Sequence, residues 1–314
     1  MRSVFLLIVF LAAAPAQKLV LYELAGRIVP EGIASVTLFG ATSPYTASTL
    51  SSERGRFTFK NLEPATYTLA MYQPGRGEAR RTIEIGPGLA DAQRRVALTI
   101  ELREDDFDRT SETRRHRVAA RELTVPDRAI REYADAQRDL QNRDVAAAEK
   151  RLEKAVAMAP QFALAWNNLG TIAYQTRRFP LAETRFRNAL EHDPTAYEPL
   201  VNLGGVLVTL HKLDEALEVN VHATLTRPND ALANSQLGMT YFELGQLDAA
   251  VKYLEQARKL DPAHFSHPQL FLAEIHLRRG EPRAAADVLD EFLRHHPDYP
   301  QAEAVRRNIV KLRQ

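Results

Sequence analysis

Residues 163–196, ALAWNNLGTIAYQTRRFPLAETRFRNALEHDPTA, decide the fold of this 314-residue chain. Apolar and small residues recur every three or four positions in two runs, which is the spacing of two amphipathic helices. Pro194 follows the second run and fixes the backbone where the helix pair must stop. Equivalent prolines recur at intervals of 34, 34, 34 and 35 residues, namely Pro160, Pro194, Pro228, Pro262 and Pro297. Self-similarity at this period predicts a stack of helix–turn–helix units.

The side chains of this unit resemble the tetratricopeptide repeat (TPR), and the resemblance covers residues 127–314. It implies a multidomain, mainly α protein whose larger part is an α-helical solenoid. Five helix pairs would be followed by a capping helix at residues 301–312, all coiled into a right-handed superhelix with a concave inner wall. The residues that carry the resemblance are Trp166, Leu169, Gly170, Ala182, Phe186 and Ala189.

Glycines recur at one position of the three central repeats. Gly170, Gly204 and Gly238 are predicted to lie where the two helices of a pair cross, because no side chain would fit there. The first repeat has Ala136 at this position and the fifth has Ala273. Such departures are expected at the ends of an array, where each repeat has only one neighbour.

The N-terminal part of the chain shows a different period. Apolar residues mostly alternate with polar ones from residue 19 to residue 102, and glycines and prolines interrupt them, which predicts six or seven short strands. Residues 55–62 (GRFTFKNL) and the following strand at residues 66–69 (TYTL) resemble the carboxypeptidase regulatory-like (transthyretin-like) domain. Ala65 stands where that family usually has Gly. The resemblance implies a small, non-catalytic antiparallel β-sandwich, which we assign to residues 17–103.

The first sixteen residues are typical of a secretory signal peptide. Arg2 supplies a positive charge, residues 4–14 are an unbroken apolar run, and Ala14-Pro15-Ala16 fits a small-x-small cleavage site. A membrane-spanning helix needs about 20 apolar residues, so this run is short for an anchor, although an uncleaved anchor is the alternative. We therefore expect cleavage after Ala16 and a periplasmic or secreted protein without a stable membrane anchor.

A charged linker is predicted between the two parts, at residues 104–126. It is acidic at residues 104–108 and basic at residues 114–117. Blocks of like charge are usually solvated, which favours a linker, and the alternative is that the basic run docks a partner.

Patterns that would indicate catalysis are missing. The chain has no cysteine, and 41 Lys and Arg balance 40 Asp and Glu, so thiolate chemistry and a charge-driven affinity for nucleic acid are excluded. It contains neither a Gly-x-Ser-x-Gly elbow nor a Gly-rich phosphate loop. The histidine pairs His264/His267 and His295/His296 lack the further ligands that a zinc site needs. We predict a non-enzyme with no catalytic residue, no cofactor and no metal.

Candidate binding residues lie on the predicted first helices, which line the concave wall in this repeat family. Asn168, Asn202 and Gln236 occupy the same position of successive repeats. A carboxamide offers a donor and an acceptor, as a peptide unit requires, so three in register suit an extended backbone. The alternative is that this position is commonly Asn in the repeat and is merely solvated. Neighbouring candidates are Asn167, Thr171, Gly205, Met239, Phe242 and Glu243.

These features favour an exported, non-enzymatic adaptor that binds a protein or an extended peptide in the groove of the superhelix. The sandwich would contact a second surface or cap the array. The alternative hypothesis makes the sandwich a carbohydrate- or cell-envelope-binding module, with the repeats mediating oligomerisation or complex assembly. A groove that binds the peptide backbone does not indicate which partner it binds, because the backbone is the same in every protein.

Overall fold

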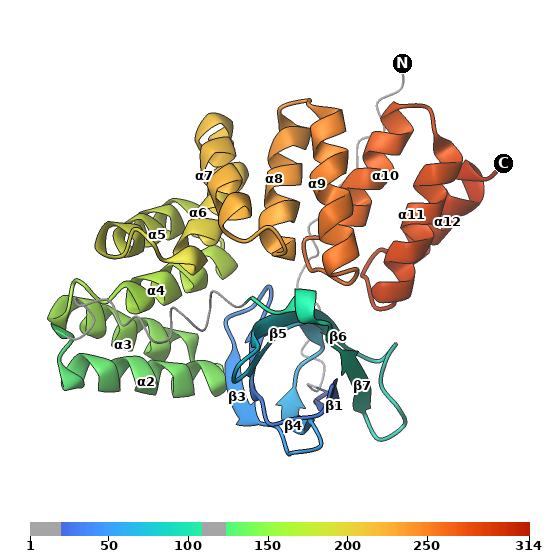
Figure 1. Cartoon of the computed structure of the whole chain (residues 1–314). Coiled ribbons are helices and arrows are strands. Elements are labelled where there is room, and N and C mark those ends of the chain that lie inside the picture. Colours follow the sequence, from blue (N-terminus) through green and yellow to red (C-terminus); the bar gives the residue numbers. More distant parts are fainter. Residues whose placement is uncertain (1–19, 109–123) are drawn as a thin grey trace.

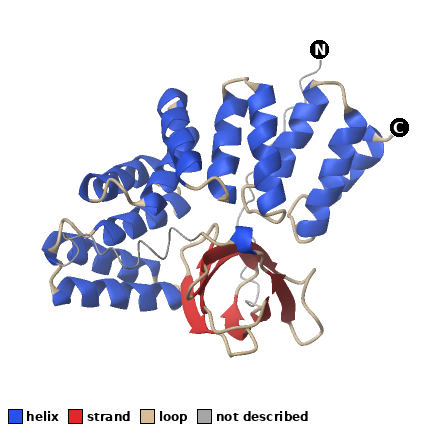
Figure 2. Ribbon diagram, viewed as in Figure 1, coloured by secondary structure: helices blue, strands red, loops and turns tan. Residues whose placement is uncertain are grey.

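The computed structural model describes residues 20–108 and 124–314, which form a strand-rich region and a helical region (Figures 1 and 2). The predicted signal segment at residues 1–16 lies outside the described residues, and so does the basic part of the predicted linker. Within the described residues no helix combines the length and the apolar character that crossing a membrane requires.

The β region consists of two small sheets that share one core. One sheet has the strand order β4-β1-β7, and the other has the order β3-β2-β5-β6. Leu24, Leu38, Leu69 and Ile85 point into the common core and are almost completely buried. The strands are β1 (Tyr22–Val29), β2 (Ser35–Gly40), β3 (Thr46–Leu50), β4 (Arg56–Leu62), β5 (Ala65–Gln73), β6 (Gly77–Ile85) and β7 (Arg95–Glu101). Two-residue alternation therefore predicted this region well, because it reports which face of a strand is buried.

Strand direction departs from the expectation of a wholly antiparallel sandwich. The four-stranded sheet is antiparallel throughout, but β7 runs parallel to β1, with Glu23 opposite Arg95 and Val29 opposite Glu101. The alternation of buried residues carries no information about direction, so the sequence pattern could not reveal this pair.

The acidic start of the predicted linker is ordered and packed. Glu104–Asp106 form a short 3₁₀ helix, and Phe107 is buried in the core of the β region. The backbones of Asp108 and Glu78 then exchange hydrogen bonds, with the Asp108 N–H 2.8 Å from the Glu78 oxygen. Phe107 and its neighbours Asp106 and Asp108 are thus packed against the β region, whereas Glu104 and Asp105 are exposed. An aromatic residue within the acidic run supplies enough apolar surface to fix it.

The helical region contains the predicted five pairs and a capping helix. Each repeat proline lies in the loop two residues beyond the end of a second helix, as the period predicted. The pairs are α2 (Asp127–Gln141) with α3 (Val145–Met158), α4 (Ala163–Gln175) with α5 (Phe179–His192), α6 (Tyr197–Thr209) with α7 (Leu213–Thr226), α8 (Ala231–Glu243) with α9 (Leu247–Leu260), and α10 (Pro268–Arg278) with α11 (Pro282–His295); α12 (Ala302–Leu312) follows them.

The repeat glycines lie at the helix crossings. A Cβ placed on Gly170 would be 2.5 Å from the ring of Phe186, and one on Gly238 would be 2.7 Å from Leu254. Gly204 meets a polar partner instead, because its Cβ would lie 1.9 Å from Oδ1 of the buried Asn220. The prediction that glycine is needed where the two helices of a pair cross is confirmed at all three positions.

The β region lies on the concave side of the helical arc, beneath the repeats in Figure 1. Contacts run the length of the array. At one end, Nε of Arg143 lies 2.8 Å from Glu63 Oε1, and at the other the Gly88 N–H donates to the carboxylate of Asp298 at 2.9 Å. Between them, Gln175 donates to the Gly40 carbonyl at 2.9 Å. The β region is therefore docked along the array rather than capping its end.

Candidate functional site

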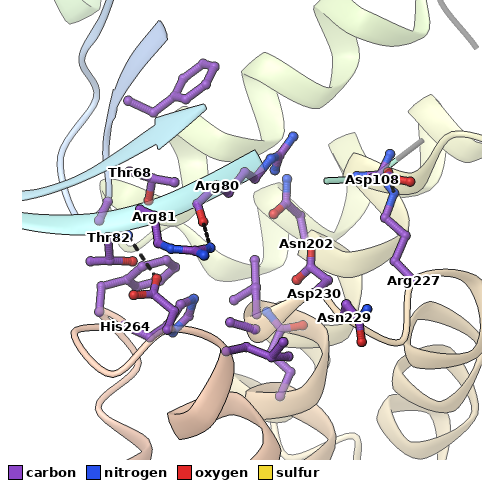
Figure 3. A pocket seen from close by; sticks show the side chains of 18 of the residues that line it. Thr68, Arg80, Arg81, Thr82, Asp108, Asn202, Arg227, Asn229, Asp230 and His264 are labelled. Carbon is purple, nitrogen blue, oxygen red and sulfur yellow. Dashed lines mark hydrogen bonds and ion pairs between the residues drawn. The ribbon is translucent and has the colours of Figure 1, made fainter. Parts of the chain in front are cut away.

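A cavity of about 410 Å³ separates the β region from the first helices of the central repeats (Figure 3). One wall comes from β6, the end of β2, Thr68 of β5, and residues 105–108. The other comes from α4, α6 and α8 and from the loops after α7 and α9. The volume lies within the range of about 300–1,000 Å³ that is usual for ligand pockets.

Strand β6 forms the β wall because it is the edge strand of its sheet. Every second residue of β6 turns its backbone N–H and C=O away from β5. The first of these residues is Glu78, which pairs with Asp108. Thr82 is the next but one in this series, and its N–H donates to Oδ2 of Asp261 at 2.9 Å. Its side chain is buried, at 6% exposure, and Oγ1 has no hydrogen-bond partner among the residues that the structure describes.

The helix wall presents four of the predicted binding residues, one of which is Gly205 on α6. Thr171, Asn202 and Gln236 lie on α4, α6 and α8 respectively and line the cavity. Gln236 is 9% exposed, and its Oε1 accepts no hydrogen bond from any described group. Its amide fills the space over Gly205, where a Cβ would lie 2.4 Å from Nε2. Asn202 donates through Nδ2 to Asn167 Oδ1 at 3.2 Å.

The other predicted residues lie outside the lining of the cavity. Asn168 donates to the Tyr133 hydroxyl at 3.3 Å, which ties the second repeat to the first. Met239 and Phe242 pack against the hydrophobic core between α9 and α10, and Phe242 stacks edge-on with Phe271. The structure thus brings together Thr171, Asn202, Gly205 and Gln236, with Asn167 bonded to Asn202. It does not bring Asn168, Met239, Phe242 or Glu243 to the cavity.

The charges around the cavity are unequal. Three guanidinium groups face six carboxylates. Each arginine is already paired: Arg80 with Glu78 at 2.8 Å, Arg81 with Asp106 at 2.7 Å, and Arg227 with Asp108 at 2.8 Å. The remaining three carboxylates belong to Asp105, Asp230 and Asp261. The described lining therefore carries a surplus of negative charge.

These three carboxylates differ in their surroundings. Asp105 is exposed, and Asp230 caps α8 by accepting from the Ala233 N–H at 3.0 Å. Asp261 is only 6% exposed, and no Lys or Arg of the described residues forms an ion pair with it. Burial lowers the pKa of the neighbouring His264 below its ordinary value, although the charges of Asp261 and Asp230 oppose that shift. His264 is therefore neutral near neutral pH and supplies no compensating charge.

The four histidines singled out in the sequence gather at the junction of α9, α10 and α11 without forming a metal site. The ring centroids of His267 and His296 are 4.6 Å apart, and Nδ1 of His296 lies 3.5 Å from Glu84 Oε2. In the described part of the chain no group of three or more His, Asp or Glu side chains is arranged to hold a metal ion.

Residues of the β wall were not among the sequence candidates. Thr82 and Asp261 are 179 positions apart, and no local pattern links a strand residue to the end of a distant helix. The repeat pattern gave no signal for Asp261 either, because the residue before the repeat proline is also an acid in the second repeat, at Asp193, whereas it is Ala159 in the first and Arg227 in the third.

Comparison with known proteins agrees with the helical architecture. Tetratricopeptide repeat profiles match residues 133–183, 169–223 and 241–309, which together make up about half of the chain. Human tetratricopeptide repeat protein 5 is 31% identical over 167 residues, covering 47% of this chain and 37% of that protein. The human cell division cycle protein 16 homolog is 30% identical over 158 residues, covering 46% of this chain and 25% of that protein. The chain therefore spans well under half the length of either relative.

Solved structures show the same fold at low identity. PilF from Pseudomonas aeruginosa is 21% identical with a TM-score of 0.51, covering 59% of this chain and 84% of that chain. MamA from Desulfovibrio magneticus RS-1 is 21% identical with a TM-score of 0.50, covering 55% of this chain and 98% of that chain. The repeat profiles, the period of the prolines and the eleven helices lead to one conclusion: the chain belongs to the tetratricopeptide repeat family, with an N-terminal β region of two small sheets.

Proposed function

We propose that this protein is an exported, non-enzymatic adaptor that holds an extended segment of a partner protein in the cavity between its two regions. Tetratricopeptide repeat proteins bind protein partners and are generally non-catalytic scaffolds. The proposal adds a place for the partner, between β6 and the first helices of the second, third and fourth repeats.

The observation that carries the proposal is the pair Asn202 and Gln236. They are equivalent residues of successive repeats, both line the cavity, and Gln236 keeps a buried carbonyl oxygen without a donor in the described structure. A buried acceptor left unpaired costs about 1–3 kcal/mol. Because this oxygen is covered in the structure, the Gln236 side chain would have to turn toward the cavity to accept a peptide N–H and recover this energy.

Affinity capture from an envelope extract, followed by mass spectrometry, tests the binding site. We expect Asn202→Ala combined with Gln236→Ala to lose the proteins that the unaltered chain captures. Asn168→Ala is the matched control, because Asn168 has the same chemistry but bonds Tyr133 away from the cavity. Circular dichroism must show equal helicity in all variants. Equal capture by the double variant and the control would show that the cavity does not bind the partner.

The exported location rests on residues 1–16, where a positively charged start, an apolar run and Ala14-Pro15-Ala16 follow one another. Expression in a bacterium, followed by cell fractionation and N-terminal sequencing, tests it. We expect a periplasmic or secreted protein that begins at Gln17. An intact N-terminus in the cytoplasm would contradict it.

We further propose that the β region is related to the carboxypeptidase regulatory-like domain, because residues 55–62 and 66–69 resemble that domain. Its role in this proposal is structural: β6 supplies one wall of the binding site.

A further inference from the structure

We propose that the cavity selects a partner segment that carries a lysine or arginine side chain, whose cationic head is bound by Asp261 together with Thr82 and Gln236. The inference rests on the proposed function above and specifies the chemistry of its ligand. It assigns to the β region a direct share in recognition.

The first argument is the charge of the lining. With six carboxylates and three paired arginines among its described residues, the cavity repels an anionic ligand and attracts a cation. The attraction of a cation is stronger in a confined space with a surplus of negative charge, because less water is present to screen the charges.

The second argument is Asp261 itself. The residue is only 6% exposed and lies in the cavity lining, and its Oδ2 accepts the N–H of Thr82 at 2.9 Å. A neutral N–H compensates a buried carboxylate only in part, and buried charges in proteins are normally paired with an opposite charge. His264 is neutral for the reason given above, and the structure pairs no described Lys or Arg with Asp261. A cation brought by a ligand would complete the pair.

The third argument is independent of charge. Two further buried side chains of the lining have oxygen atoms that accept no hydrogen bond from any described residue: Oγ1 of Thr82 and Oε1 of Gln236. They belong to opposite walls, one to β6 and the other to α8. An ammonium group has three donors and no acceptor, and a guanidinium has five donors. Either one matches a set made of a carboxylate, a hydroxyl and an amide oxygen, once the Thr82 and Gln236 oxygens, which are covered in this structure, turn toward the ligand.

The apolar part of the lining fits the rest of such a side chain. Tyr174, Phe186 and Phe265 contribute aromatic surface to the same cavity. Lysine and arginine bury their methylene stems along apolar surface while the charged head finds polar partners. The cavity therefore offers a route for the stem as well as a site for the head.

Peptide selection on the purified protein tests the inference. A random heptapeptide library displayed on phage is selected against the immobilised protein and, in parallel, against Asp261→Asn and Asp298→Asn. Asn at position 261 keeps an oxygen for the Thr82 N–H but removes the charge. Asp298 is the matched control, because it also accepts a backbone N–H of the β region, that of Gly88, yet lies outside the cavity lining.

We expect selected peptides to carry Lys or Arg at one fixed position with the unaltered protein and with Asp298→Asn, and to lose this preference with Asp261→Asn. A selected peptide is then synthesised with norleucine in place of its basic residue. Fluorescence polarisation should show at least about tenfold weaker binding to the unaltered protein, equivalent to about 1.4 kcal/mol. Binding to Asp261→Asn should not depend on this replacement.

The outcomes separate the two proposals. Selected peptides without a basic residue, whose binding is lost in Asn202→Ala with Gln236→Ala, would overturn the cationic inference and leave the proposed groove function standing. A basic preference that persists in Asp261→Asn would also overturn the inference. Failure to enrich any peptide above the starting library would overturn both.

Discussion

The stability of the last repeats should fall steeply as the solution becomes acidic, because His267 resists protonation in the folded state. Burial, with smaller contributions from the charges of His296 and His264, lowers the pKa of His267 from 6.5 to about 3. Its ring lies 5.2 Å from that of Phe292 and 5.7 Å from that of Tyr299, which is an apolar setting for a cation.

The sign follows from proton uptake. Between pH 6.5 and about 3 the unfolded chain binds a proton at His267 that the folded chain excludes, so the free energy of unfolding decreases as the pH falls. Each pH unit corresponds to about 1.4 kcal/mol for one such group. Lowering the pH from about 7.5 to about 4.5 should therefore cost about 2.7 kcal/mol from His267 alone, most of it below pH 6.5. Above about pH 7.5 the contribution is nearly constant, since both states are then neutral.

Urea denaturation followed by circular dichroism, at about pH 7, 5.5 and 4.5, measures this dependence. The matched variant is His267→Asn, which cannot titrate and tolerates the left-handed backbone at this position, where φ is 52°. Burial also lowers the pKa of His264 and of His295, and these groups remain in both proteins, so the difference in slope isolates His267. Parallel pH profiles for the two proteins would refute the reasoning.

Three further substitutions test the packing of the repeats by thermal and urea unfolding. Asn220→Leu should change the free energy of unfolding by less than about 1 kcal/mol, since it removes a buried Oδ1 without a partner among the described groups but also the 3.0 Å hydrogen bond that Nδ2 donates to Thr240 Oγ1; a loss above about 2 kcal/mol would contradict this. His211→Gly should stabilise by about 0.5–1 kcal/mol, because His211 has φ of 55° in a turn where Gly245 serves the fourth repeat; an unchanged midpoint would speak against strain. Gly170→Ala should destabilise by about 1–3 kcal/mol, because its Cβ would meet the ring of Phe186 at 2.5 Å, and a neutral effect would show that the ring yields freely.

The helical region was predictable because its information is local and repeated. Gly170 and Phe186 are separated by the last residues of α4, a short loop and the first two turns of α5, and the same relation returns one repeat later at Gly204 and Asn220. A period of this kind reveals both the elements and their contacts, since each repeat touches mainly its neighbours. The β strands were predictable in number for a similar reason, whereas the parallel pairing of β7 with β1 was not, because no periodicity encodes direction.

The site was only half predictable. Asn202 and Gln236 follow from the repeat pattern, and the structure places both at the cavity. Asn168 has the same place in its repeat but is turned toward Tyr133, a residue of the atypical first repeat. The other half of the site, Thr82 and Asp261, depends on how the β region docks, and no pattern within either region contains that information.

Docking of the β region also changes the mechanics of the solenoid. In a simple repeat array the curvature is free to vary, because each unit contacts only the next. Here one rigid body is bonded to the first repeat through Arg143, to the second through Gln175, to the fourth through Asp261, and to the loop after the fifth through Asp298. A change in curvature would have to break several of these contacts together. The cavity thus has fixed walls, and a partner that fits it does not need to spend binding energy on ordering the groove.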